Sequence, residues 1–264
     1  MRTALTIAGS DSSGGAGVQA DLKTFAAFGV YGLSAVTVVT AQSTIGITAS
    51  MPLPADLVTA QIETVAGDVA INATKIGMLA TAAIVEAVVA AIEALELPLV
   101  VADPVVMSSS GHRLLDADGV LALTSVLLPQ VRVVTPNIPE AELIAAQRIA
   151  SLADARDAAK RIQGLGAAAV VITGGHAAGG GEVIDLLLDD DTFYEFRTPR
   201  IDAAGTHGTG CAFASAIAAL LARGSALPQA VERAQAYVAG AIARRLAIGG
   251  GQNLIDHMWT MRSG

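Results

Sequence analysis

Short runs of apolar, often β-branched residues alternate along the chain with longer, alanine-rich segments whose apolar positions recur at helical spacing. Strands that are apolar at consecutive positions are typical of a parallel sheet buried on both faces. The pattern predicts strands at 4–8, 34–41, 73–78, 97–106, 131–136 and 167–173, and helices at 16–28, 55–67, 82–95, 117–127, 139–146 and 152–165. The predicted fold class is therefore α/β, an open, mostly parallel sheet with helices on both faces.

The pattern changes after a glycine-rich stretch that ends at residue 181. The segments 182–188 and 192–201 flank an acidic turn and predict an antiparallel hairpin at the edge of the sheet. Helices at 210–223 and 228–246 then close the chain. Because no linker rich in proline or serine interrupts the sequence, we expect one domain over residues 1–264.

Composition narrows the possible partners and locations. The 264 residues are 53% hydrophobic and 15% charged, with a formal net charge of -8, which argues against a broad surface for nucleic acid. The longest apolar windows are too short to span a bilayer, so no membrane partner is expected. A single cysteine cannot form an internal disulfide and fits a reducing compartment, and the first residues lack the apolar stretch of a signal peptide. We therefore expect a cytoplasmic protein.

Polar and glycine-rich segments follow the predicted strands, where ligands bind in open α/β sheets. The first of these segments contains a formal dinucleotide fingerprint at 15–20, but the next strand ends in Gln42 rather than in the acidic residue that a nicotinamide site needs. A P-loop is excluded because Gly15 and Ala16 stand where lysine and serine or threonine are required. Asp21, early in the following helix, either complements the helix dipole or contacts substrate.

Two acidic residues at the same end of the sheet are candidates for a metal site. Asp103 ends a strongly apolar strand, and a carboxylate in such a position needs a partner or a cation. Asn137, Pro139 and Glu140 have the spacing of a helix capping box, yet an asparagine and a glutamate there could equally bind magnesium. Both interpretations of Glu140 stay open at this point.

The strongest signal is the segment GTHGTGCAF at 205–213, a glycine-rich turn that opens a helix and contains the one cysteine. The free N–H groups and the helix dipole at such a turn favour anions and suit phosphoryl transfer. The same field should lower the pKa of Cys211, which could then take the proton from an acceptor alcohol. The alternative is a small buried residue at a close helix contact.

Several segments taken together resemble the ribokinase-like superfamily and, within it, the hydroxymethylpyrimidine and phosphomethylpyrimidine kinases of thiamine biosynthesis. The segments that carry the resemblance, in order, are LTIAGSDSSGGAGVQADLKTFAAFGVYG, TAQST, KIGMLA, ADPVV, SGHRLL, TPNIPEAELI, TGGH and THGTGC. The resemblance implies an ATP- and Mg2+-dependent phosphorylation of 4-amino-5-hydroxymethyl-2-methylpyrimidine to its monophosphate and then to its diphosphate. It also implies a homodimer without a separate lid domain.

The resemblance further implies a role for each matching residue. Gln42 would hydrogen-bond the pyrimidine, and Gly208, Thr209 and Gly210 would form an anion hole beside Cys211 as catalytic base. The remaining roles are a pyrimidine pocket completed by Gly9, Asp21, Met78 and Val105, magnesium ligands Asp103 and Glu140, and residues near the nucleotide phosphates, Thr173, Thr206 and His207.

Three positions depart from the family pattern. Thr173 stands where many relatives have lysine, Gly205 where asparagine is usual, and Ser109 where some relatives have lysine. These departures put rate and nucleotide preference in question more than the reaction class. Two alternatives stay open: a pyridoxal or pyridoxine kinase of the same cysteine-bearing branch, and a catalytically silent pyrimidine-binding module.

Overall fold

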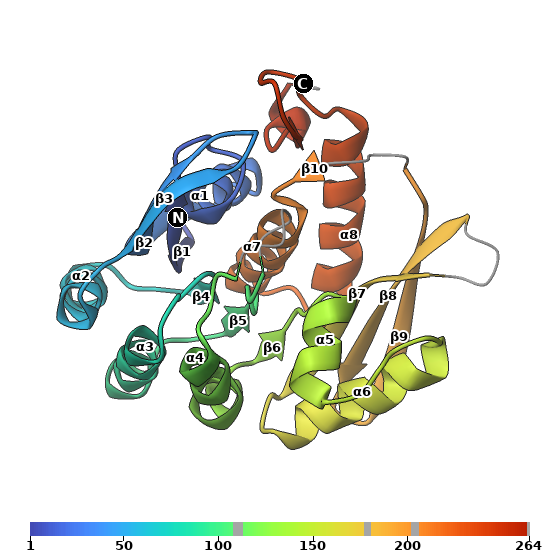
Figure 1. The fold of residues 1–264 in the computed structure, drawn as a ribbon, viewed down its shortest axis with the longest axis horizontal. Coiled ribbons are helices and arrows are strands. Elements are labelled where there is room, and N and C mark those ends of the chain that lie inside the picture. The colour runs from blue at the N-terminus through green and yellow to red at the C-terminus, as the bar shows by residue number, and fades with distance from the viewer. Residues whose placement is uncertain (108–112, 177–180, 202–205, 263–264) are drawn as a thin grey trace.

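The computed structural model describes residues 1–107, 113–176, 181–201 and 206–262. Within these residues, nine strands form one sheet in the order β3-β2-β1-β4-β5-β6-β7-β8-β9 (Figure 1). The parallel strands are β1 (Thr3–Asp11), β2 (Tyr31–Gln42), β4 (Ala73–Ile76), β5 (Val100–Ala102), β6 (Val133–Val134) and β7 (Ala169–His176). The mostly parallel α/β sheet expected from the sequence is confirmed.

Antiparallel strands lie at both edges of this sheet. At one edge β8 (Glu182–Asp189) and β9 (Thr192–Pro199) form the predicted hairpin. At the other edge β3 (Ile47–Pro52) pairs with β2, and the sequence pattern did not predict this strand. Most of its residues are exposed, so it lacks the apolar run that marks the buried strands.

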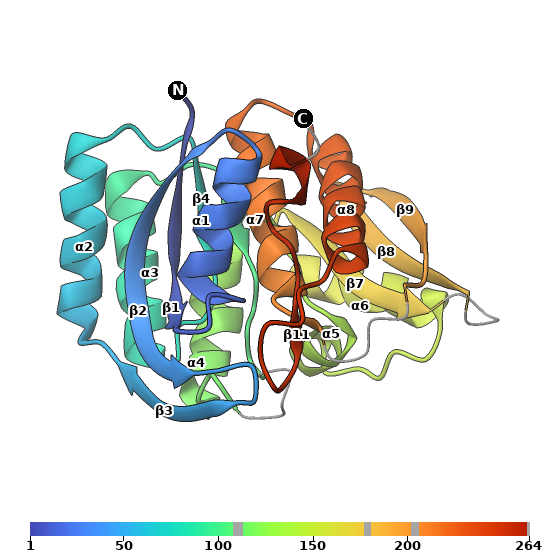
Figure 2. The same ribbon diagram turned by 90° about the horizontal axis from the view of Figure 1, so that it is seen from above.

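Helices cover both faces of the sheet, as expected (Figures 1 and 2). One face carries α2 (Ala55–Asp68), α3 (Ala82–Leu95), α4 (Ala117–Ala122), α5 (Ile138–Ala145) and α6 (Leu152–Gly164). The other face carries α1 (Gly17–Ala27), α7 (Thr209–Ala222) and α8 (Leu227–Ala243), and α7 is buried along nearly its whole length. A short parallel pair, β10 (Thr206–His207) and β11 (Asn253–Leu254), lies before α7 and near the C-terminus.

The predicted helix at 117–127 is interrupted. After α4 the chain forms a π-helical turn over Leu123–Leu127 and a 3-10 turn over Leu128–Gln130. The hydroxyls of Thr124 and Ser125 donate to carbonyl oxygens of the preceding turn, which is typical of a loosened helix. Pro129 then prevents a regular continuation.

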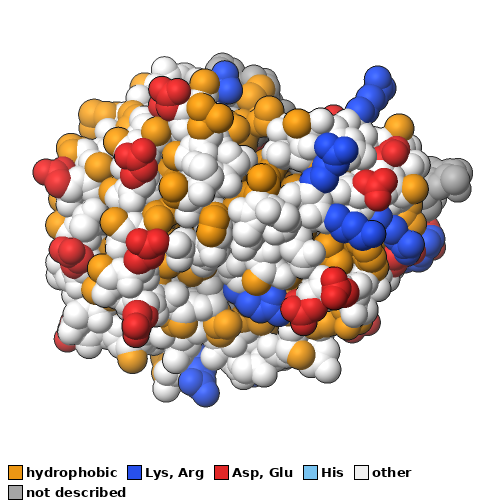
Figure 3. All heavy atoms as spheres, turned by 90° about the horizontal axis from the view of Figure 1, so that it is seen from below, with side chains coloured by type: hydrophobic (Ala, Val, Ile, Leu, Met, Phe, Trp, Pro, Cys, Tyr) orange, Lys and Arg blue, Asp and Glu red, His pale blue; other side chains and the backbone are white. Residues whose placement is uncertain are grey.

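The outer surface of the α2 to α6 layer is divided by charge (Figure 3). Acidic side chains gather over α2 and α3, where the exposed residues include Glu63, Asp68, Glu86 and Glu93. Lysine and arginine lie mainly over the other half of this face, and the described residues seen from this side form no continuous basic surface. Among the described helices, none has both the length and the apolar character required to cross a bilayer.

Candidate active site

A cavity of about 430 Å³ opens beyond the carboxyl ends of β1, β2, β4 and β5. This is the edge at which parallel α/β sheets bind their ligands. Most of the residues predicted from the sequence line it together: Gly9, Gln42, Met78, Asp103, Val105, Glu140, Thr206, His207, Gly208, Thr209, Gly210 and Cys211. The structure therefore brings residues from six separate segments to one site.

A second cavity of about 360 Å³ lies next to the first. Its walls include Thr173 and Gly174 in β7, and Val238 and Ile242 on α8. Thr173 does not line the first cavity. Both cavities share Asn137, Thr209 and Gly210, so they meet at the start of α7.

The start of α7 presents backbone N–H groups to the place where the cavities meet. The residue before the helix, Gly208, has φ +90, and a Cβ there would lie 1.8 Å from the carbonyl oxygen of Gly15. Only glycine tolerates this conformation and this close approach. Gly208 has no side chain that could cap the helix, and its carbonyl oxygen accepts from the N–H of Ala212. The N–H groups of Thr209, Gly210 and Cys211, which come before Ala212, can therefore bind an anion.

Cys211 lies in the first turn of α7 and keeps some exposure toward the cavity. The prediction that its pKa is lowered is wrong: burial raises the pKa of Cys211 to about 12. The positive charge of Lys75 and a hydrogen bond from the N–H of Gly17 lower the pKa, but they do not offset burial and the negative charges of Asp103 and Asp21. The thiol is therefore neutral at neutral pH in the free protein.

Lys75, which the sequence analysis did not single out, forms the floor of the cavity. It is fully buried in β4, and its Nζ lies 3.0 Å from Oδ2 of Asp21. Asp21 also accepts hydrogen bonds from Thr6 and Ser215, at 2.6 Å each. Asp21 itself is not among the residues that line the cavity, and its carboxylate holds Lys75, which does line it. The sequence does contain a signal for this ion pair. Lys75 stands within an otherwise apolar strand, and a buried cation needs a counter-ion.

Asp103 and Glu140 are both buried at the cavity wall. The capping box at the start of α5 is present: Glu140 accepts from the N–H of Asn137, and the side chain of Asn137 accepts from the N–H of Glu140, both at 3.0 Å. Burial, and then the negative charge of Asp103, raise the pKa of Glu140 to about 8. Burial also raises the pKa of Asp103, although Lys75 and a hydrogen bond from Cys211 oppose this. The cavity wall therefore carries two acidic side chains, Asp103 and Glu140, while the nearby cation Lys75 is already paired with Asp21.

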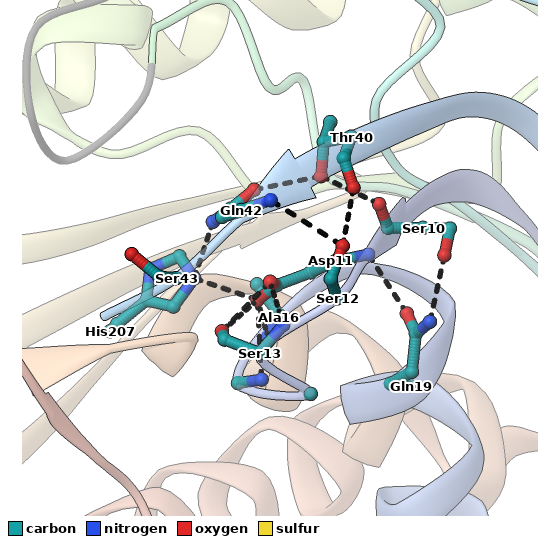
Figure 4. Close-up of polar contacts among 12 residues, drawn as sticks. Ser10, Asp11, Ser12, Ser13, Ala16, Gln19, Thr40, Gln42, Ser43 and His207 are labelled. Atoms are coloured by element: carbon teal, nitrogen blue, oxygen red, sulfur yellow. Dashed lines mark hydrogen bonds and ion pairs between the residues drawn. The ribbon is translucent and has the colours of Figure 1, made fainter. Parts of the chain in front are cut away.

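Gln42 and His207 lie side by side at the end of the cavity nearest β2 (Figure 4). The side-chain Nε2 of Gln42 is 3.0 Å from Nε2 of His207, and the same ring nitrogen is 3.0 Å from Oδ2 of Asp11. The sequence analysis expected His207 near the nucleotide phosphates, whereas here its ring contacts Gln42, the residue predicted to bind the pyrimidine.

Two of the positions that depart from the family pattern, Ser109 and Gly205, lie outside the described residues.

Comparisons with known proteins place the chain in a kinase family. The family model described as "Phosphomethylpyrimidine kinase" matches residues 11–256. The chain belongs to this kinase family. It is therefore a phosphotransferase, as the sequence predicted, and the suspected relationship to hydroxymethylpyrimidine and phosphomethylpyrimidine kinases is confirmed.

Individual relatives match over nearly their full length. The hydroxymethylpyrimidine/phosphomethylpyrimidine kinase of Rhizobium meliloti is 46% identical over 257 residues, which cover 96% of each chain. The phosphomethylpyrimidine kinase of Clostridium difficile is 38% identical, with a TM-score of 0.82 over 92% of this chain and 100% of that one. The pyridoxal kinase of Bacillus subtilis, solved with ADP, is 36% identical, with a TM-score of 0.91 over 100% of both chains.

Proposed function

We propose that the chain transfers the γ-phosphoryl group of ATP to the hydroxymethyl oxygen of 4-amino-5-hydroxymethyl-2-methylpyrimidine, and then phosphorylates the monophosphate to the diphosphate, as a step in thiamine biosynthesis. The observation that carries this proposal is the position of the α7 start, which lies between two adjoining cavities. A donor in one cavity and an acceptor in the other would meet at Thr209 and Gly210. Family membership supports both the reaction and the pyrimidine.

The two cavities differ in a way that suits two substrates. Gln42, Met78 and Val105 give the first cavity one carboxamide and apolar walls, which fits a small heteroaromatic ring. The second cavity has apolar side chains of α8 on one side and Thr173 on the other, and we assign it to the nucleotide. Support for the nucleotide comes from the Bacillus subtilis neighbour, which was solved as an ADP complex.

Phosphoryl transfer mainly requires positive electrostatic potential around the transferred group. The free N–H groups of Thr209, Gly210 and Cys211 would supply it as an anion hole. As the thiolate, Cys211 would accept the proton of the acceptor hydroxyl as the new O–P bond forms and the bond to the leaving ADP oxygen breaks. Because the charge of Asp103 is one cause of the raised thiol pKa, compensation of that charge would favour the thiolate.

The acidic wall also fits a magnesium ion. Asp103 and Glu140 would provide oxygen ligands, and a cation between them would offset the burial and the neighbouring negative charge that raise the pKa values of these carboxyl groups. The described residues contain no group of three or more histidine, cysteine, aspartate or glutamate side chains arranged around one metal position. Mg2+ is commonly held by one or two carboxylates together with substrate phosphates and water, so two carboxylates suffice. When bound, Mg2+ would supply positive charge to the phosphates of ATP.

The direct test measures ADP release by the purified protein in Mg-ATP with the pyrimidine, and follows the mono- and diphosphate by chromatography. The expected result is sequential formation of both products. Release of ADP that does not depend on any added acceptor, or no release with any acceptor, would contradict the proposal. The second outcome would favour a silent binding module.

A second candidate is a pyridoxal or pyridoxine kinase, because the Bacillus subtilis pyridoxal kinase superposes with a TM-score of 0.91. Both classes of substrate have a hydroxymethyl group on a six-membered nitrogen heteroaromatic ring. The same assay with pyridoxal and pyridoxine ranks the substrates by kcat/KM. We expect the pyrimidine to be preferred.

We also propose that the enzyme is a homodimer that works in the cytoplasm. The edge strand β3 and its surroundings expose the apolar side chains of Val39, Ile45 and Met51, which suits contact with a second copy. A cysteine that acts as a base must stay reduced, which a reducing compartment ensures. Light scattering after size exclusion, expected at twice the chain mass, tests the dimer, and a monomeric mass would contradict it.

A further inference from the structure

One ring nitrogen of His207 is shared between two polar partners (Figure 4). It lies 3.0 Å from Oδ2 of Asp11 and 3.0 Å from the side-chain Nε2 of Gln42. An imidazole nitrogen either carries a proton and donates, or carries a lone pair and accepts. The two contacts require opposite states, so one of the partners determines the state of this nitrogen.

Asp11 is the partner that determines it. Burial alone would raise the pKa of Asp11, but hydrogen bonds from His207, from Ser13 and from the N–H of Ala16 hold the pKa below its ordinary value. Asp11 is therefore a carboxylate at neutral pH, and a carboxylate only accepts hydrogen bonds. Nε2 of His207 must then carry a proton and donate it to Asp11. It has no lone pair left for an N–H of Gln42.

The contacts of Thr40 indicate which group of the Gln42 carboxamide lies at the end that faces away from His207. Its Oγ1 lies 2.8 Å from the carbonyl oxygen of Ser10 and 3.1 Å from Oε1 of Gln42. A hydroxyl has one proton, and the carbonyl of Ser10 can only accept, so the proton belongs to that contact. The hydroxyl of Thr40 then offers Gln42 a lone pair, which matches an amide N–H.

Both ends of the carboxamide are matched when its NH2 group faces the lone pair of Thr40 and its carbonyl oxygen faces His207. The single N–H at Nε2 of His207 is then shared between Asp11 and this carbonyl oxygen as a bifurcated hydrogen bond. The two ends of a carboxamide have nearly the same shape, so their hydrogen-bond partners decide which end is which. We propose that His207, held by Asp11, is a positioning residue that fixes the Gln42 carboxamide in this orientation and so selects the ring that Gln42 contacts.

The specificity part of this inference rests on the proposed function. The fixed carboxamide keeps one lone pair and one N–H for the cavity, and this pair matches a ring edge with an amino donor next to a ring-nitrogen acceptor. The aminopyrimidine has such an edge. Pyridoxine has hydroxyl-bearing substituents along that edge and no amino group next to a ring nitrogen, so it does not offer the same paired donor and acceptor to Gln42.

Other contacts keep the ring of His207 in place. A Cβ at Gly15 would lie 2.9 Å from Cδ2 of His207, so the β1–α1 loop packs directly against the ring. The backbone of His207 also pairs with Leu254 in the short β10–β11 ladder. The histidine is therefore confined between the loop that carries Asp11 and the C-terminal segment.

The first test needs no substrate, so it is independent of the proposed function. Long-range 1H–15N spectra of the ligand-free protein at pH 8 report which ring nitrogen of His207 carries the proton. The expected result is a protonated Nε2, and a spectrum with a bare Nε2 and a protonated Nδ1 would overturn the proposal.

The second test compares two substitutions of His207 in steady-state kinetics. His207→Gln keeps an N–H donor near the position of Nε2, whereas His207→Leu removes it. We expect His207→Leu to raise the KM for the pyrimidine about tenfold, as for one lost hydrogen bond, and to reduce the preference over pyridoxine by a similar factor. His207→Gln should retain most of the wild-type preference, and kcat and the KM for ATP should change by less than about twofold in both variants.

Thermal unfolding of both variants and of Arg197→Ala, a substitution on the exposed hairpin, serves as the folding control. A raised KM for ATP or a lowered kcat with an unchanged pyrimidine KM would overturn the proposal, because it would place His207 at the phosphates. Equal effects of His207→Gln and His207→Leu on the KM for the pyrimidine would also overturn the proposal. If the wild type released no ADP with the pyrimidine, the proposed function would fail, while the spectra would still decide the state of His207.

Discussion

The ammonium group of Lys75 lies 3.0 Å from the carboxylate of Asp21, and neither side chain reaches solvent. The pair lies under the cavity, between β4 and α1, and the hydroxyls of Thr6 and Ser215 complete the coordination of the carboxylate. The positive charge of Lys75 also lowers the pKa of two other groups that line the cavity, Cys211 and Asp103. One buried ion pair thus supports the fold and sets the electrostatics of the site.

Removal of one partner of this pair should strongly destabilise the protein. Lys75→Met leaves the carboxyl group of Asp21 buried without its counter-ion, and such changes typically cost about 3–5 kcal/mol. Chemical denaturation should show this loss in the free energy of unfolding. The matched control is Arg197→Ala, which breaks exposed ion pairs and should leave the unfolding midpoint unchanged. Equal midpoints for the two variants would contradict a structural role for the buried pair.

Replacement of the thiol should affect the chemical step and leave binding intact. Cys211→Ala removes the proposed base and should lower kcat by at least ~10², while pyrimidine binding changes little because the cavity walls and Gln42 remain. Initial rates and a binding titration separate the two effects. A kcat equal to that of the wild type would move the proton acceptor to another group, of which Asp103 is the nearest candidate.

The raised thiol pKa can be tested by alkylation. With a pKa of about 12, Cys211 should react with iodoacetamide at pH 8 far more slowly than a small-molecule thiol, because the thiolate is the nucleophile. Asp103→Asn removes one of the charges that raise this pKa, so alkylation of that variant should be faster at the same pH. Mass spectrometry follows both rates, since the chain has one cysteine. A slower variant would contradict the assigned sign of the Asp103 effect.

The sequence predicted the parts of the fold that depend on local pattern. Buried parallel strands are apolar at consecutive positions, and the turns after them are polar, so both the sheet and the cavity edge could be placed. The edge strand β3 could not be predicted, because its exposed residues carry no such pattern. The interruption near Leu123 was missed for a similar reason, since the apolar spacing continues across it.

The chemistry of the site was harder to predict because it depends on contacts between distant segments. The helix start at Cys211 favoured a low thiol pKa, but burial by residues far along the chain reverses the sign. Gln42 and His207 are 165 positions apart, and neither motif indicates that their side chains meet. Lys75 was predictable in principle, since its strand is otherwise apolar, but the interpretations considered for its partner Asp21 were a helix-dipole contact and a substrate contact, not an ion pair.

The lowered pKa of the buried residue His257 predicts how the stability of the protein depends on pH. It is 4% exposed, and within the described residues its Nε2 has no hydrogen-bond partner. Burial, and then the positive charge of Lys23, lower the pKa of His257 from 6.5 to about 4 in the folded protein. Above pH 6.5 the ring is neutral in both the folded and unfolded states, so it has no effect on stability there. Between these two values the unfolded chain binds more protons, and stability falls as the pH falls.

The size of this effect is large enough to measure with one substitution. At pH 5 the linkage amounts to a loss of about 2 kcal/mol relative to neutral pH. His257→Leu has no titrating ring and keeps the backbone carbonyl that accepts the hydroxyl of Tyr237. We therefore expect the difference in unfolding free energy between wild type and variant to shift by about 2 kcal/mol in favour of the variant from pH 7.5 to pH 5. A difference that stays constant over this range would show that His257 does not titrate in the folded protein with the lowered pKa.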